Sequence, residues 1–419
     1  MFQKYTTEED LLVLLEPIKS VVSVSVGLWI KTGSRDENEH QHGYAHFLEH
    51  MLFKGTKNYS VRELAQVIDR VGGQHNAATN REYTCFYINV VYDHIELAIK
   101  VLADMYYNSL LEAHELKKEK NVIIEEIRMY EDTPDELIHD LFVEKMLSNH
   151  SLSHSILGDI DSISTVSRDS LLDFYQSHYT NDNAIFVISG NFDVDKVKEY
   201  IAKYFSMGTK KSKKLPDQNS QPVRADYFHV QRNLEQIHFC LGLNGIKKQD
   251  DDRWPLYVLS TILGGSMSSR LFQNIREKEG ISYSIYSFHS SYHDCGIFGI
   301  YCATAPDTFH TAIDLIVKEC QDLIENGITN EEFEDSKSFM LGNLALSLES
   351  IEVRMGQLAK NEISFGRNYT FKEINDKIKN ISLDDFKRIS DRIFKDQTFS
   401  IISIGKLKEA DIIKLDLSI

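Results

Sequence analysis

Hydrophobic and polar residues alternate over residues 22–30 (VSVSVGLWI) and residues 237–243 (IHFCLGL), which predicts a β-strand in each stretch. An acidic turn and then a helix follow each strand. A second helix comes next, over about residues 60–71 in the first half and 268–279 in the second, and each stops at a glycine. The same order of elements in both halves indicates an internal duplication.

The first of these second helices has clear end signals. Ser60 and Glu63 form a capping box, and Gly72 suits the left-handed position after a helix. Both halves then return to strands and close on an apolar strand that ends in glycine, over residues 82–91, 283–287, 297–303, 184–190 and 399–405. This mixture predicts an α+β fold with two similar halves, each a mostly antiparallel sheet packed with helices.

A polar segment divides the two halves. Residues 210–222 (KKSKKLPDQNSQP) hold two of the six prolines and no periodic apolar pattern, so we interpret them as a linker. We therefore predict an N-terminal domain over residues 1–209 and a C-terminal domain over residues 223–419. The length of 419 residues also favours at least two domains.

Composition narrows the function classes. A formal net charge of −17 argues against nucleic-acid binding, which needs a positive surface. The five cysteines are odd in number, widely spaced and free of CxxC pairs, which favours a reducing compartment over a disulfide framework. Acidic residues stand where a signal peptide would be apolar, and no apolar run reaches the length of a membrane span. We expect a soluble cytoplasmic protein with no membrane partner.

The main candidate for chemistry is the segment 43–53 (GYAHFLEHMLF), which predicts a helix. His46 and His50 are one turn apart, so both imidazoles can reach one ion at about 2.1 Å. Glu49 lies beside that face, where its carboxylate can reach a metal-bound water. HxxEH is the inverted form of the HExxH zinc motif, although a helix with two incidental histidines has the same pattern. His40 and His42 share no face with the motif, and we interpret them as solvent-facing loop residues.

A catalytic zinc needs a third protein ligand. Residues 112–130 predict a long charged helix on which Glu119 and Glu126 are two turns apart and share a face, whereas Glu125 points about 100° away from Glu126. Most acidic runs of this kind only solvate a helix. The spacing by itself does not decide whether these glutamates face a metal site or only solvate the helix.

These motifs together resemble the pitrilysin, insulinase and mitochondrial-processing-peptidase family of zinc peptidases, and most closely its short bacterial members. Residues 46–56 are similar to the family's first metal motif, and residues 121–131 (NVIIEEIRMYE) to its second. The resemblance implies that His46, His50 and Glu126 bind one Zn²⁺ per chain, with Glu49 as general base and Glu119 as a supporting carboxylate.

Two further motifs extend the resemblance over essentially the whole chain. Residues 72–77 (GGQHNA) resemble the edge strand on which substrate lies extended, which implies that Asn76, Ala77, Ala78 and Glu82 contact the peptide. Residues 264–283 resemble a glycine loop followed by an arginine–tyrosine pair. This implies that Arg276 and Tyr283 bind the substrate carbonyl or the oxyanion. The second half has no HxxEH motif, so we expect it to support substrate without binding zinc.

The resemblance implies a zinc-dependent endopeptidase that hydrolyses peptides or unfolded segments in a closed chamber. The chain has half the length of the long members yet carries both sets of motifs, so we expect a homodimer. Two alternatives stay open. The chain is a subunit of a heterodimeric processing peptidase that needs a distinct partner, or it is a non-catalytic peptide-binding homologue.

Overall fold

The computed structural model describes residues 2–212, 224–408 and 415–419. The chain forms two compact units. Unit 1 contains Met1–Met129, His154–Gln218 and Ser347–Asn368, and unit 2 contains Tyr130–Ser153, Asn219–Leu346 and Tyr369–Ile419. The segment 210–222 lies largely outside the described residues, so the linker stays a prediction.

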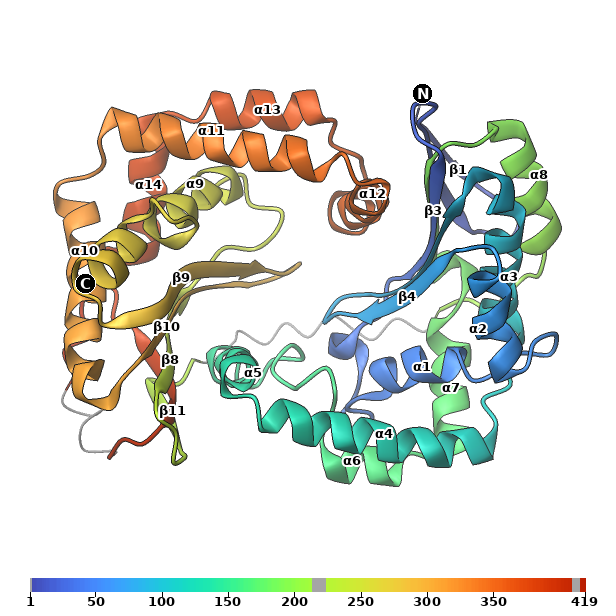
Figure 1. The fold of residues 1–419 in the computed structure, drawn as a ribbon, viewed down its shortest axis with the longest axis horizontal. Coiled ribbons are helices and arrows are strands. Elements are labelled where there is room, and N and C mark those ends of the chain that lie inside the picture. The colour runs from blue at the N-terminus through green and yellow to red at the C-terminus, as the bar shows by residue number, and fades with distance from the viewer. Residues whose placement is uncertain (1, 213–223, 409–414) are drawn as a thin grey trace. The chain divides into compact units, whose positions relative to one another are not determined.

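Unit 1 is built on a six-stranded sheet in the order β1-β2-β6-β3-β5-β4. Figure 1 labels β1, β3 and β4 of this sheet. All neighbouring strands are antiparallel except β2 and β6. The strands are β1 (Gln3–Thr6), β2 (Leu12–Pro17), β3 (Ser23–Ile30), β4 (Gln74–Thr79), β5 (Thr84–Val91) and β6 (Ala184–Gly190).

Unit 2 repeats this arrangement with five strands in the order β7-β11-β8-β10-β9. Within unit 2, β7 and β11 are the one parallel pair among the strands that the structure describes. The sequence of parallel and antiparallel neighbours equals that of β2-β6-β3-β5-β4, which confirms the predicted α+β fold with two similar halves. The strands are β7 (Tyr227–Gln231), β8 (Ile237–Asn244), β9 (Ser282–Ser291), β10 (Gly296–Thr304) and β11 (Ser400–Gly405).

Helices pack on both sheets. Those that belong to unit 1 are α1 (Tyr44–Leu52), α2 (Val61–Asp69), α3 (Ile95–Asn108), α4 (Ala113–Glu131), α6 (Ile160–Thr165), α7 (Arg168–His178), α8 (Val194–Tyr204) and α12 (Ile351–Phe365). Those of unit 2 are α5 (Pro134–Met146), α9 (Arg253–Gly264), α10 (Phe309–Glu325), α11 (Asn330–Ser347), α13 (Phe371–Lys379) and α14 (Leu383–Phe394). Among the described residues, no helix has the length and apolarity that a membrane crossing needs.

The two units exchange one helix each. Helix α5 comes from the first half of the sequence but packs on β8 and β11 of unit 2, and α12 comes from the second half but packs on β3 and β6 of unit 1. A strand must present a small residue where a helix lies this close. A Cβ on Gly27 of β3 would stand 2.6 Å from Met355 Sδ, and one on Gly242 of β8 would stand 2.5 Å from the Phe142 ring. The compact units therefore differ from the sequence halves in these two segments.

The exchange also explains a feature of β3. Its valine–serine alternation predicts one buried and one exposed face, yet the strand is buried on both faces from Val24 to Ile30. One face meets α3 in the main core of unit 1, and the other, with Trp29, meets Met355 and Leu358 of α12. Ser25 is buried and its hydroxyl donates to Met355 Sδ at 3.2 Å.

The structure confirms the predicted start and end signals of the helix that precedes β4. The capping box of Ser60 and Glu63 starts α2, and Gly72 has a φ of +67°. The predicted helix over residues 268–279 is different: its main part, Phe272–Lys278, is a π-helix. Wider turns of this kind are rare and recur at functional sites.

Candidate metal centre and active site

Helix α1 brings the two motif histidines together. It packs against α7 and against strands β4 and β5 of unit 1, and Phe47, Leu48 and Met51 anchor it in the core. The rings of His46 and His50 lie 4.7 Å apart, centre to centre, on the face that is turned away from this core. His46 is buried at 7 % exposure, and His50 is half-buried.

The third potential ligand comes from α4. Glu126 Oε2 lies 3.8 Å from His46 Nε2 and 3.6 Å from His50 Nε2. Two donor atoms that each stand about 2.1 Å from a tetrahedral ion are about 3.4 Å apart, so the three side chains fit one zinc with only small adjustments. His46, His50 and Glu126 thus form a cluster whose ligand atoms all lie within 4.8 Å of one another.

Glu119 holds the second histidine. Its Oε2 accepts from His50 Nδ1 at 3.1 Å, and its Oε1 pairs with Lys54 Nζ at 2.8 Å. Burial raises the pKa of Glu119, but the bonds from His50 and Lys54 outweigh burial and leave that pKa below its usual value. The proton on Nδ1 leaves the lone pair of Nε2 free and aimed at Glu126, which is the tautomer a metal ligand requires.

His46 has no such support. Its Nδ1 is buried without a hydrogen-bond partner among the described residues. Burial, followed by the neighbouring His50, lowers the pKa of His46 to about 3. The ring is therefore neutral at ordinary pH and available as a nitrogen donor, so the donor set of two neutral imidazoles and one carboxylate suits Zn²⁺.

Glu49 lies next to this cluster and reaches strand β4. Its Oε2 accepts from Thr79 Oγ1 at 2.5 Å. Burial raises the pKa of Glu49, while the Thr79 hydroxyl opposes that rise. A carboxylate with a raised pKa beside a metal cluster has the properties of a general base.

A second cluster of potential ligands occurs in unit 2, where atoms of His150, Asp294 and Cys295 lie within 4.8 Å. The Leu152 amide donates to His150 Nδ1 at 3.2 Å, so the ring proton is on Nε2, which lies 3.3 Å from Asp294 Oδ2. A protonated Nε2 cannot bind a metal. These contacts make His150 a buried link between loops, and the cluster on α1 and α4 is the better metal site.

Strand β4 forms one edge of the unit 1 sheet, next to α1. Its residues alternate between exposed and half-buried, with Asn76 and Ala78 exposed and Ala77 half-buried. Glu82 is not on this strand. It lies in the turn before β5, where its Oε1 pairs with Arg35 Nη1 at 2.5 Å.

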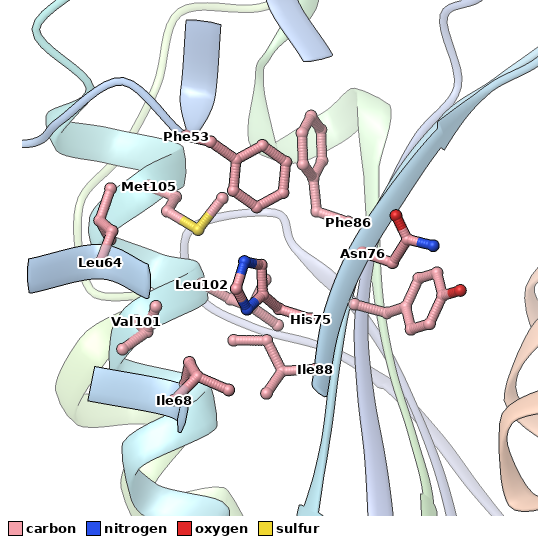
Figure 2. Close-up of a pocket in the computed structure, with 11 residues that line it drawn as sticks. Phe53, Leu64, Ile68, His75, Asn76, Phe86, Ile88, Val101, Leu102 and Met105 are labelled. Atoms are coloured by element: carbon pink, nitrogen blue, oxygen red, sulfur yellow. The ribbon is translucent and has the colours of Figure 1, made fainter. Parts of the chain in front are cut away.

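An apolar pocket opens beside this edge strand. Figure 2 shows the His75 ring pointing between Phe53 and Met105, with Phe86 and Leu102 nearby. The His75 and Phe53 ring centres are 5.5 Å apart. The other residues that line the pocket are Leu64, Ile68, Asn76, Tyr87, Ile88 and Val101.

Arg276 and Tyr283 lie together in unit 2. Arg276 is on the π-helix, and its guanidinium lies over two rings, 4.6 Å from the centre of Phe272 and 4.8 Å from that of Tyr283. Tyr283, on β9, is 76 % exposed. The stacked guanidinium and the exposed phenol present two hydrogen-bond donors from neighbouring positions.

The loop before α1 contains residues that the sequence interpretation missed. His40 is exposed, as expected, but His42 is half-buried and stacks on His154, with ring centres 4.1 Å apart. Glu37 is buried and accepts from the Gly43 and Ala45 amides. Burial raises the pKa of Glu37 well above its usual value, and these amides oppose that rise. Glu37 belongs to an acidic turn, which by itself looks like a solvated loop.

Comparison with known families gives two matches that follow each other along the chain. Residues 12–160 match the family described as insulinase, peptidase family M16, and residues 165–340 match the peptidase M16 inactive domain. The boundary between the matches separates the HxxEH segment from the arginine–tyrosine segment.

Relatives match over almost the full chain. An uncharacterized zinc protease of Bacillus subtilis, YmxG, is 40% identical over 409 residues, which is 96% of this chain and 98% of the relative. One from Rickettsia felis is 34% identical over 94% of this chain and 95% of its own. Among solved structures, a Helicobacter pylori protease superposes with a TM-score of 0.91 at 23% identity, covering 97% of this chain and 99% of that one. A peptidase M16 inactive domain from Pseudomonas fluorescens gives 0.90 at 20%, covering 97% and 98%.

Proposed function

The chain belongs to the insulinase family, peptidase family M16, and from this premise we propose that it is a zinc-dependent endopeptidase. The observation that carries the proposal is the convergence of His46 and His50 from α1 with Glu126 from α4. We assign these three side chains as the ligands of one Zn²⁺ per chain. That ion supplies a Lewis acid and lowers the pKa of a bound water towards about 7.

Glu49 is the general base in this proposal. Its carboxylate takes a proton from the attacking water and returns it to the leaving nitrogen. The raised pKa of Glu49 suits both roles, because a stronger base accepts the proton more readily and a neutral acid survives long enough to donate it. Glu119 orients His50 and keeps Nε2 unprotonated, so it acts through the ligand and not on substrate.

Strand β4 is the substrate-binding edge. A peptide in extended form pairs with the free backbone groups of such an edge, and this gives affinity without regard to sequence. Asn76, Ala77 and Ala78 are the residues that we place against the peptide. Glu82, paired with Arg35, flanks the strand. Selectivity would then come from side-chain contacts beside the strand, next to the small apolar pocket around Phe53 and Met105.

Arg276 and Tyr283 contribute from unit 2 by donating hydrogen bonds to the substrate carbonyl or the developing oxyanion. Stacking on two rings keeps the Arg276 guanidinium planar and oriented before substrate arrives. We propose that the working form is a homodimer, a closed chamber that admits peptides and unfolded segments. The described cysteines form no disulfide, and we propose a reducing compartment such as the cytoplasm.

The test is digestion of unfolded proteins and quenched peptides by the purified chain, with and without chelator, read by mass spectrometry. We expect cleavage that chelation stops and Zn²⁺ restores, with light scattering at the mass of two chains. Cleavage that appears only when a second, different subunit is added would favour the heterodimeric alternative. Stoichiometric zinc without cleavage of any peptide would favour a peptide-binding protein.

A further inference from the structure

The N-terminus of α1 is capped from outside the helix. Gly43 occupies the N-cap position with a φ of +88° and has no side chain to accept a hydrogen bond. The first amides of a helix have no partner within it. Here Glu37 replaces the missing cap, because its Oε2 accepts from Gly43 N at 2.9 Å and its Oε1 accepts from Ala45 N at 2.7 Å.

Glu37 is itself held in place. His154 Nε2 lies 2.7 Å from the Ser34 carbonyl and 3.2 Å from Glu37 Oε2. A carbonyl only accepts, so Nε2 carries the ring proton and donates to both oxygens. The His154 ring stacks on His42 with an angle of 11° between the planes. Both oxygens of Glu37, whose side chain is fully buried, therefore accept from fixed N–H donors.

The surrounding backbone is too tightly packed to move freely. A Cβ on Gly43 would stand 2.6 Å from the Leu157 carbonyl oxygen, and one on Gly158 would stand 2.6 Å from that of His42. The loop that carries His154 therefore packs directly on the turn that starts α1. Glu37 joins this loop to the helix through hydrogen bonds at both ends of its carboxylate.

The two metal-binding histidines differ in what holds them. His50 is fixed through Glu119, whereas His46 has a buried Nδ1 with no partner in the described part of the chain. His46 follows Ala45, whose amide is one of the two that Glu37 binds. The position of the His46 ring is thus set by the start of α1.

We propose that Glu37 is a positioning residue that fixes the start of α1 and thereby His46 Nε2, and that His154 fixes Glu37. This inference rests on the proposed function of α1 as the metal-binding helix. Glu37 touches neither metal nor substrate, so its effect is on the geometry and affinity of the metal site.

The main variant is Glu37→Gln, which keeps the size but leaves one acceptor oxygen and turns an NH₂ group towards a donor. We expect the zinc dissociation constant to rise about tenfold, as for other groups that orient metal ligands. We also expect kcat to fall with KM nearly unchanged, and the visible spectrum of the Co²⁺-substituted protein to change. His154→Phe keeps the ring stack but removes the third donor, and should weaken zinc binding less than Glu37→Gln.

The matched control is Asp193→Asn. Asp193 Oδ1 accepts from Asp195 N and Lys196 N at the start of α8 in the same unit, so this variant makes the same carboxylate-to-amide change at a helix cap away from the metal cluster. It should leave zinc affinity and the Co²⁺ spectrum unchanged. If Glu37→Gln matches Asp193→Asn in both measurements, the positioning role is wrong.

Hydrogen exchange of the metal-free proteins separates this inference from the proposed function. Glu37→Gln and His154→Phe should speed amide exchange across residues 44–52, and Asp193→Asn should not. Unchanged exchange in both variants overturns the positioning role, even if the wild-type chain is a zinc peptidase. If both variants exchange faster but the wild-type chain binds no zinc, the helix anchor is supported and only the peptidase proposal is overturned. If Glu37→Gln does not fold, His154→Phe carries the same comparisons.

Discussion

The two units have sheets of similar topology but differ in the helix that follows the central strand. In unit 1, α1 follows β3 and carries two histidines and a glutamate, whereas in unit 2, α9 follows β8 and reads RWPLYVLSTILG, with no histidine or acid. Both helices are largely buried, so an apolar face is what the two have in common at this position. The chemistry is added on the remaining face, which is why similarity between the halves does not imply similar function.

The polar groups of unit 2 lie elsewhere, on the π-helix and β9. In the proposed division of labour, unit 1 holds the metal and the base, and unit 2 supplies donors for the substrate. Substitutions in each unit therefore have different expected signatures.

The largest effect should come from Glu49→Gln in unit 1. The variant keeps His46, His50 and Glu126 but removes the base, so we expect turnover to fall by about 10³-fold or more with zinc still bound. Peptide kinetics and metal analysis on one preparation measure both quantities. Glu125→Gln is the control, because Glu125 is exposed and pairs with Arg128. Retained turnover would remove Glu49 from the mechanism.

The next effect concerns unit 2. Arg276→Ala should lower kcat by about 100-fold and Tyr283→Phe by a smaller factor, because each removes a donor to the developing charge. Zinc content should not change. Lys278→Ala removes a cation from the same π-helix and should have wild-type kinetics. Wild-type kinetics in both Arg276→Ala and Tyr283→Phe would mean that unit 2 has no part in the chemistry.

The exchanged helices give a prediction about stability. Gly242→Val should lower the unfolding free energy by about 1–3 kcal/mol, because the new side chain overlaps the Phe142 ring. Gly27→Val should cost less, since the flexible thioether of Met355 moves more easily than a ring. Urea unfolding measures the order of the two. The reverse order would contradict this reason, because it would mean that the Phe142 ring yields more easily than the Met355 thioether.

The smallest effect is the acid sensitivity of unit 2. Burial lowers the pKa of His289 to about 4, and its Nδ1 is buried without a partner among the described residues. Between about pH 6.5 and pH 4 the unfolded chain binds a proton that the folded chain does not, so the stability present above pH 6.5 is lost as the pH falls.

Metal-free protein is suited to measuring this effect. Between pH 7 and pH 5 the wild-type unfolding free energy should fall by up to about 2 kcal/mol more than that of His289→Gln. His229→Gln is the control, because the half-buried His229 is also on a strand of unit 2 but both of its ring nitrogens have hydrogen-bond partners, Ser403 and Gln231. An equal fall in wild type and His289→Gln would mean that this ring is not held neutral by the fold.

The sequence predicted local elements well where the signal lies within one element. The closing strand of the first half was predicted over residues 184–190 and is β6 (Ala184–Gly190). The charged helix predicted over residues 112–130 is α4 (Ala113–Glu131). Strands β1 and β2 were missed, because their pattern of apolar residues is short and interrupted by the turn at Asp10, which has a φ of +67°. The π-helix was also missed, since a segment of 7 residues is too short for the wider turn to show as a distinct period of apolar residues.

For the site, helical spacing alone grouped His46 with His50 and Glu119 with Glu126, because residues on one helix face are fixed by the chain itself. Only the tertiary structure decided that α1 and α4 lie together, that Glu119 turns to His50 and Glu126 to the space between the rings, and that Glu82 pairs with Arg35. Glu37 and the exchanged helices α5 and α12 also emerged only there. Their partners are distant in sequence, and the energy of a contact between distant segments depends on packing that no local pattern encodes.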